Sequence, residues 1–142
     1  MKIKTITKKK LSKKICKKVL KSEVLTREKY ENYSFCGDKT SFKCGLYFLF
    51  NEEYEILYIG MVGNASNTSL YDRMVGHGSG SHKQKDKRWY SFVKWCKFYR
   101  FNGLNDNELK QLERLAIFGM GQPPYNDVDI NKEDILFLYN KI

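Results

Sequence analysis

Apolar and aromatic residues alternate with polar stretches along this chain in a way that predicts a β-hairpin over residues 44–61. Two apolar, β-prone runs are separated by the polar stretch 51–55, which is typical of a hairpin connection. With a turn centred on residues 52–53, Tyr47 pairs with Tyr58 directly across the two strands. Directly opposed side chains share one face of a sheet, so this register predicts that two phenol groups lie side by side.

Two helices are expected after the hairpin, and each begins with a residue type that favours a helix start. Ser69 with Asp72, and Asn105 with Glu108, have the spacing of a capping box, in which two side chains satisfy free backbone N–H groups. The second helix is expected over residues 105–118, where apolar residues recur on one face. Glycines that follow each apolar pattern predict where the helices end.

A third strand is expected over residues 89–101, which are dense in aromatic residues and in other residues that favour strands. This strand would lie between the two helices in the chain. The resulting order of strand, strand, helix, strand and helix predicts an α+β domain with an antiparallel sheet.

Residues 1–22 form a basic N-terminal arm with helical periodicity. Leu11, Ile15 and Val19 recur at four-residue intervals, and lysines occupy the other faces. Such a helix is able to lie on DNA, on an anionic membrane or on its own domain. The remaining residues 23–142 have the length of one domain.

The positive charge of the chain is concentrated in two segments. The 142 residues include 26 Lys and Arg and 16 Asp and Glu, which give a net charge of +10. Residues 1–21 hold ten lysines and no acid, whereas the charges of the remaining residues cancel. Within that remainder, residues 83–100 hold seven bases and one acid. Two basic segments of this kind favour a nucleic-acid partner.

Composition excludes several other classes of protein. A hydrophobic content of 42% with 15% aromatic residues is incompatible with general disorder. No apolar run approaches the length that spans a bilayer, so no membrane partner is expected. The four cysteines are scattered, without a CxxC pair or paired histidines, which favours reduced thiols in a cytoplasmic protein over a zinc site or a disulfide framework.

Five polar residues lie on apolar elements and are candidates for chemistry. Glu113 lies within the apolar stripe of its helix, where a carboxylate costs free energy unless it is paired with an arginine or binds a metal. Arg73 and His77 are four residues apart and share a helix face. Each residue also has an ordinary interpretation: Tyr47 and Tyr58 as sheet residues, the arginine as a surface group and the histidine as a helix-end group. One at a time, they establish no function.

Taken together and in order, the residues match a known pattern. It comprises Gly45-Leu46-Tyr47, Tyr58-Ile59-Gly60, Arg73, His77, Glu113 and Pro124-Tyr125-Asn126. With this pattern the chain resembles the GIY-YIG nuclease family over about residues 44–127. The resemblance implies a three-stranded antiparallel sheet flanked by helices, and it implies metal-dependent hydrolysis of DNA phosphodiester bonds.

The resemblance also implies roles for the matching residues. One of Tyr47 and Tyr58 activates or positions the attacking water, Arg73 stabilises charge on the phosphate, and His77 occupies a position that is histidine or tyrosine in the family. Some members place a lysine soon after the second motif, and residues 61–67 hold none. A free tyrosine has a pKa near 10, so it needs a cation or a proton relay to act as a base. We favour Tyr58 for the proton step, with His77 assisting.

A single divalent cation is implied by the resemblance as well. Glu113 matches the glutamate that holds this ion, Mg²⁺ or Mn²⁺, and Asn126 matches an asparagine near the site. One carboxylate is sufficient, because Mg²⁺ completes its coordination with water and substrate phosphate oxygens. No cluster of acidic residues is therefore required.

Both basic segments are expected to contact DNA phosphates. The candidate residues are Lys8, Lys9, Lys10, Lys13, Lys14, Lys83, Lys85, Lys87 and Arg88. The layout favours a stand-alone endonuclease of the type II restriction kind. A phage, mobile-element or repair nuclease of the same family stays open, as does a non-catalytic DNA-binding module. One active site per chain would cut both strands as a homodimer on DNA or by sequential nicking.

Overall fold

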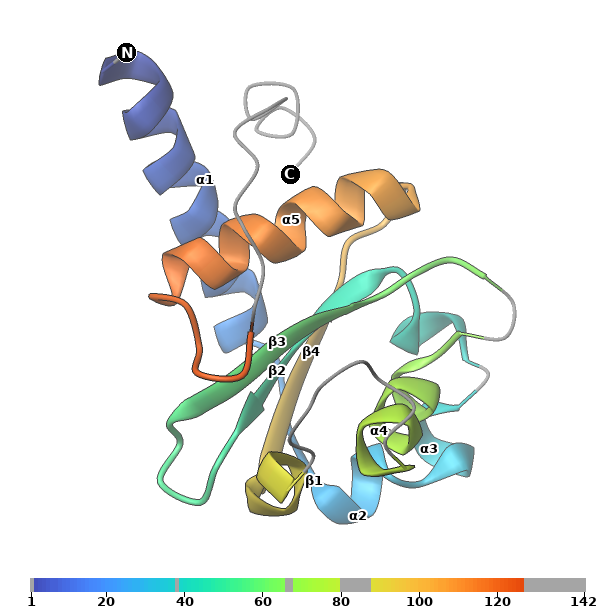
Figure 1. Ribbon diagram of the computed structural model, residues 1–142. Coiled ribbons are helices and arrows are strands. Elements are labelled where there is room, and N and C mark those ends of the chain that lie inside the picture. Colours follow the sequence, from blue (N-terminus) through green and yellow to red (C-terminus); the bar gives the residue numbers. More distant parts are fainter. Residues whose placement is uncertain (1, 38, 66–67, 80–87, 127–142) are drawn as a thin grey trace.

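The computed structural model describes residues 2–37, 39–65, 68–79 and 88–126, and Figure 1 shows its elements. In chain order these are α1 (Lys2–Leu20), β1 (Val24–Thr26), α2 (Arg27–Tyr30), α3 (Tyr33–Cys36), the 3-10 helix η1 (Thr40–Phe42), β2 (Gly45–Phe50), β3 (Ile56–Val62), α4 (Leu70–Ser79), the 3-10 helix η2 (Arg88–Phe92), β4 (Trp95–Arg100) and α5 (Asp106–Gly119).

The sheet is antiparallel and has four described strands, in the order β1-β4-β2-β3. The expected α+β class is therefore confirmed, and the expected number of three strands is wrong. The additional strand, β1, has three residues and pairs with β4. Its shortness explains why the apolar pattern did not predict it, because three residues are too few to show an alternation.

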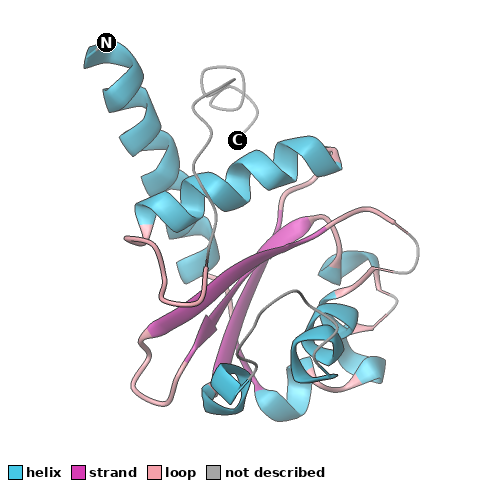
Figure 2. Cartoon of the chain, in the orientation of Figure 1, coloured by secondary structure: helices cyan, strands magenta, loops and turns pink. Residues whose placement is uncertain are grey.

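Helices cover both faces of this sheet (Figure 2). One face packs against α1 and α5, through alternate β2 residues that include Leu46 and Phe48. The opposite face packs with α4 and η2, through the intervening residues Tyr47 and Leu49. Every residue of β2 is buried, as expected for a central strand with both faces covered.

The pairing of β2 with β3 differs from the predicted register. Tyr47 lies opposite Gly60, and Leu49 lies opposite Tyr58, with an irregularity after Leu49. The two motif tyrosines are thus diagonal neighbours on one face, with ring centroids 6.1 Å apart. A Cβ atom at Gly60 would lie 2.2 Å from the Tyr47 ring, so the glycine is what admits the phenol at this position.

The third predicted strand is shorter than expected. Strand β4 begins at Trp95, and the residues before it form the 3-10 helix η2. Trp89 and Tyr90 are buried in this helix, 2% and 5% exposed, against the face of the sheet that carries Tyr47. The aromatic residues 89 and 90, which favoured a strand in the sequence, therefore lie in a helical turn that packs on the sheet.

Both predicted helix starts are confirmed. The Ser69 hydroxyl accepts a hydrogen bond from the Asp72 N–H at 3.3 Å and donates one to the Asp72 carboxylate at 2.8 Å. Asn105 and Glu108 form a full capping box, with hydrogen bonds of 2.9 and 3.0 Å. The predicted end of the first helix is too early, because α4 continues through its glycines to Ser79.

The basic arm packs on its own domain. Leu11, Ile15 and Val19 are 0% exposed and belong to the same core cluster as α5 and one face of the sheet. Figure 1 shows α1 crossing α5 on that face. The crossing is close at Gly119, where a Cβ atom would lie 2.9 Å from the Cys16 sulfur.

No helix within the described residues is long and apolar enough to cross a membrane. All four cysteines are free thiols and are buried. Burial raises the pKa of the Cys16 thiol to about 11, which keeps this thiol protonated and unreactive at neutral pH.

Candidate active site

Four of the six predicted site residues line one pocket of about 380 Å³ between the sheet, α4 and the first half of α5. Strands β2 and β3 contribute the two tyrosines, α4 contributes the arginine and α5 contributes the glutamate. The full lining consists of Tyr47, Tyr58, Met61, Arg73, Asp106, Asn107, Lys110 and Glu113. The helix starts at Ser69 and Asn105 position these groups, because they fix where α4 and α5 begin.

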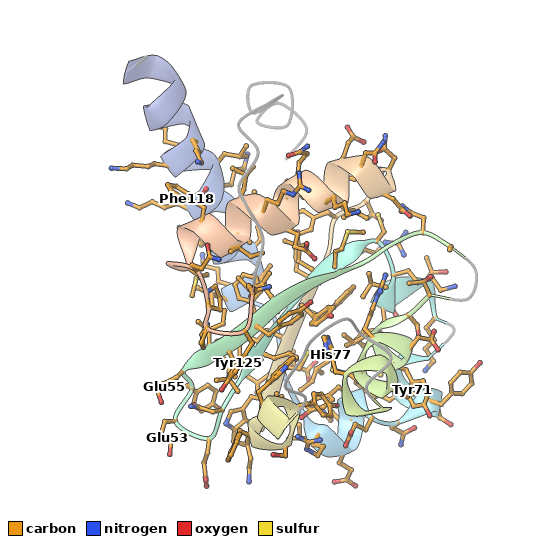
Figure 3. All side chains as sticks on the ribbon, in the orientation of Figure 1. Glu53, Glu55, Tyr71, His77, Phe118 and Tyr125 are labelled. Atoms are coloured by element: carbon orange, nitrogen blue, oxygen red, sulfur yellow. The ribbon has the colours of Figure 1, made fainter. Side chains whose placement is uncertain are left out.

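His77 lies behind the pocket, in contact with Tyr47. The Tyr47 hydroxyl and Nε2 of His77 are 2.7 Å apart in a buried hydrogen bond, and both residues are at most 2% exposed. Figure 3 labels His77, which α4 presents toward the sheet. Burial raises the pKa of Tyr47 well above 10, and Tyr58 raises it further, whereas Arg73 opposes the rise.

Tyr58 is less buried than Tyr47. Glu113 is the charged group with the largest effect on the pKa of Tyr58. Burial, followed by the charge of Glu113, raises the pKa of Tyr58 to about 12. Arg73 and the Tyr47 hydroxyl oppose this rise. At neutral pH both motif phenols are thus protonated, and neither can act as a base through its phenolate without help from its neighbours.

Glu113 is a carboxylate in an environment that disfavours its charge. Burial raises the pKa of Glu113 from 4.5 to about 7, although Arg73, Lys110, Arg114 and the backbone N–H of Met61 all lower it. The carboxyl group is therefore poised between its two forms near neutral pH. A cation at this position would restore the charged form, because it replaces the hydration that burial removes.

Arg73 is a cation of the pocket whose charge acts on Glu113, although the two groups form no ion pair. Its Nε is buried and has no hydrogen-bond partner among the described residues. No carboxylate of the described residues lies within ion-pair distance of the guanidinium, so the salt bridge that was the alternative interpretation of Glu113 is absent there. An oxyanion such as phosphate would supply acceptors for the donors of the guanidinium.

Asn126 does not line the pocket. Its side-chain oxygen accepts a hydrogen bond from the Ile59 N–H, and its amide donates one to the Ile59 carbonyl, each at 2.8 Å. The neighbouring Tyr125 N–H donates to the Leu57 carbonyl at 3.2 Å. These bonds attach the segment after α5 to the open edge of β3, beside Tyr58.

Four pocket residues were missed by the sequence argument: the apolar Met61 and the polar Asp106, Asn107 and Lys110. Helical spacing contained the signal, since Lys110 and Asp106 precede Glu113 by three and seven residues and so share its face of α5. Asp106 accepts hydrogen bonds from the Asn64 backbone and side chain at 3.0 and 3.1 Å. This ties the loop after β3 to the start of α5.

The pocket suits a lightly coordinated ion better than a caged one. No group of three or more His, Cys, Asp or Glu residues that could hold a metal occurs in the described part of the chain. Mg²⁺ accepts a single carboxylate together with water and phosphate oxygens, whereas a structural zinc ion needs four protein ligands. A single carboxylate such as that of Glu113 is compatible with Mg²⁺ or Mn²⁺ and is too few ligands for a structural zinc ion.

The predicted DNA-binding residues divide into two groups. Lys83, Lys85 and Lys87 lie outside the described residues, as does the side chain of Arg88, which begins η2. Of the five predicted lysines of α1, Lys8 is partly buried and four are exposed: Lys9, Lys10, Lys13 and Lys14. The ammonium of Lys8 lies 4.1 Å from the ring centroid of Phe118, which Figure 3 labels near the end of α5.

Helix α1 and the pocket both adjoin α5. The helix bears Glu113 and Lys110 at the pocket and carries Phe118 and Gly119 at its contact with α1.

Comparison of the chain with protein-family models, with curated proteins and with solved structures finds no match.

Proposed function

We propose that this protein is a metal-dependent DNA endonuclease that hydrolyses phosphodiester bonds in the pocket between Arg73 and Glu113. One observation carries the proposal. Arg73 and Glu113 face the same pocket of about 380 Å³, and neither forms an ion pair with a described residue. A phosphodiester together with a divalent ion would give the arginine an anion, and the carboxylate a cation, in direct contact.

Glu113 would hold the divalent cation, Mg²⁺ or Mn²⁺. Its carboxylate accepts a hydrogen bond from the Met61 N–H, which fixes the orientation of the group. When bound, such an ion neutralises charge on the phosphate and makes a bound water more acidic. The protein contributes the ligand and the partly buried pocket.

Arg73 and Lys110 would bind the phosphate. The guanidinium offers a planar fork of donors, and the Lys110 ammonium offers a second positive charge from α5. The attraction of both groups to the phosphate is strongest when negative charge accumulates on its oxygens during the reaction. Residues 61–67, which follow the second motif, hold no lysine, and Lys110 of α5 would take the place of such a lysine in the site.

We propose that the proton of the attacking water leaves through neutral groups. Tyr58 accepts this proton while its own hydroxyl proton passes to Tyr47, and the Tyr47 proton passes to Nε2 of His77. The water oxygen forms the new bond to phosphorus, and the bond to the leaving oxygen breaks. No phenolate is required, which agrees with the raised pKa values of both tyrosines.

Exposed lysines on α1 would contact DNA phosphates outside the pocket. This contact is sequence-independent, so restriction-like specificity would have to come from other residues. Sequencing the ends of cut DNA measures this directly. Unique ends would support a restriction-like enzyme, and dispersed ends would support a general nuclease.

The activity itself is tested by cleavage of plasmid DNA with Mg²⁺ or Mn²⁺. Wild type is expected to nick or cut, whereas Glu113→Gln loses at least about 100-fold in rate, because it cannot hold the ion. Glu28→Gln, at an exposed position on α2, is the matched control and is expected to cut like wild type. Salt-sensitive DNA binding without cleavage in several divalent metals would instead support a non-catalytic DNA-binding module.

A further inference from the structure

A row of stacked aromatic rings leads from the pocket to the protein surface. Tyr58 stacks with Trp89 at 5.2 Å between ring centroids and 27° between ring planes. Trp89 in turn stacks with Tyr125 at 5.2 Å and 12°. Trp89 is 2% exposed, whereas Tyr125 is 38% exposed. The row therefore begins at a residue of the proposed active site and ends at a ring that solvent reaches.

The outer ring is held in place by its backbone. The Tyr125 N–H donates to the Leu57 carbonyl, and the next residue, Asn126, makes both of its hydrogen bonds to Ile59. Figure 3 labels Tyr125, which lies along β3. An exposed aromatic ring that is already stacked and anchored loses little conformational entropy when a planar ligand binds to it.

The cavity next to this ring combines aromatic surface with groups that bind bases and phosphates. Tyr125 and the exposed Phe92 line a cavity of about 490 Å³, together with two acidic residues, Glu52 and Glu53, and two basic ones, Arg27 and Lys94. Carboxylates accept hydrogen bonds from the amino groups of bases, and basic side chains contact phosphates. An aromatic surface with polar groups beside it is the common arrangement for binding single-stranded bases.

We propose that Tyr125 is a stacking subsite for an unpaired nucleobase of the DNA strand that enters the pocket. This inference rests on the proposed function and specifies its substrate as DNA with an unpaired base near the cut. The centroids of Tyr58 and Tyr125 are no farther apart than the two 5.2 Å steps together. About three nucleotides span that distance at the ~3.4 Å rise of one strand of B-DNA.

The test compares two single-stranded oligonucleotides without allowing cleavage. One carries normal bases, and the other carries abasic sites at the same positions, so both present the same phosphates. Affinities for the full chain are measured by fluorescence anisotropy in EDTA. For wild type, the normal oligonucleotide is expected to bind about 5-fold or more tightly than the abasic one.

Variants of two exposed tyrosines distinguish the subsite from general stacking. Tyr125→Ala is expected to bring the ratio of the two affinities close to one, and Tyr125→Phe is expected to keep it. Tyr54→Ala is the matched control, because Tyr54 is 52% exposed and stacks on Trp95 at 5.3 Å, outside the residues of either cavity. Thermal melting of each variant verifies that it folds.

A wild-type ratio near one, or an unchanged ratio in a folded Tyr125→Ala protein, would overturn the inference. An unchanged ratio in Tyr125→Ala and a lost ratio in Tyr54→Ala would place the stacking elsewhere and also overturn it. The proposed function has a separate readout. Wild type that never cuts DNA in any divalent metal but keeps its Tyr125-dependent ratio would refute the nuclease and leave the base-binding subsite standing.

Discussion

Replacing Glu113 by glutamine is expected to stabilise the metal-free protein at alkaline pH. Burial raises the pKa of Glu113 to about 7, so the folded chain holds this proton up to a higher pH than the unfolded chain does. Between pH 4.5 and 7 the unfolded state therefore binds fewer protons, and stability falls as the pH rises. Above pH 7 the buried carboxylate is charged, and the full loss of unfolding free energy is present. Glutamine carries no charge and removes this loss.

The magnitude follows from the two pKa values. A pKa near 7 in the folded chain against 4.5 for an ordinary glutamate corresponds to about 3 kcal/mol of unfolding free energy at pH 8. The side chain is partly exposed, and solvent screening reduces this to about 2–3 kcal/mol. For a chain of this length, such a change raises the melting temperature by roughly 6–12 °C.

Thermal melting in EDTA at several pH values measures the effect. The advantage of Glu113→Gln over wild type should be close to zero at pH 4.5, grow up to pH 7 and level off above it. Adding Mg²⁺ at pH 8 should stabilise wild type and leave the variant unchanged, since the carboxylate is the proposed ligand of the ion. Glu28→Gln should behave like wild type throughout. A variant that is less stable than wild type at pH 8 would refute the account of Glu113 as a destabilised carboxylate.

Three further predictions concern the frame of the site. Gly60→Ala should displace the Tyr47 ring, lower the unfolding free energy by about 1–3 kcal/mol and slow cleavage at least about 10-fold. Gly78→Ala, whose Cβ would meet its nearest ring at 3.4 Å, should do neither, and equal effects in both would contradict this reason. Asn126→Ala should cost about 1–3 kcal/mol and accelerate hydrogen exchange at the Ile59 amide, which unchanged exchange would contradict. Glutamine at four exposed α1 positions should reduce the slope of log affinity against log salt by up to about 4 without changing the melting temperature, and an unchanged slope would exclude these residues from DNA contact: Lys9, Lys10, Lys13 and Lys14.

Local signals predicted the elements of the fold better than their pairing. The capping boxes at Ser69 and Asn105 depend on residues three positions apart, and both are formed. The hairpin register depends on how the strands meet across the sheet, and an irregularity after Leu49 shifts it. Strand β1 exists because it pairs with β4, which no property of three residues reveals.

The same distinction applies to the site. Each of Tyr47, Tyr58, Arg73 and Glu113 was identified from the pattern along the chain, and the fold brings all four to one pocket. Lys110 joins them because of helical spacing, which was available in the sequence and was not used. The part played by Asn126 depends on β3 being the edge strand among the described strands, which becomes visible only once the strand order is known.

Packing of α1 changes how its charge has to be tested. Leu11, Ile15 and Val19 are fully buried, and truncating one large core side chain costs about 2–5 kcal/mol. The total unfolding free energy of a domain is about 5–15 kcal/mol, so deletion of residues 1–21 is expected to unfold the protein. Loss of DNA binding after such a deletion would then say nothing about lysines. Substituting the exposed lysines leaves the core intact, and it alone separates the electrostatic contribution of α1 from its structural one.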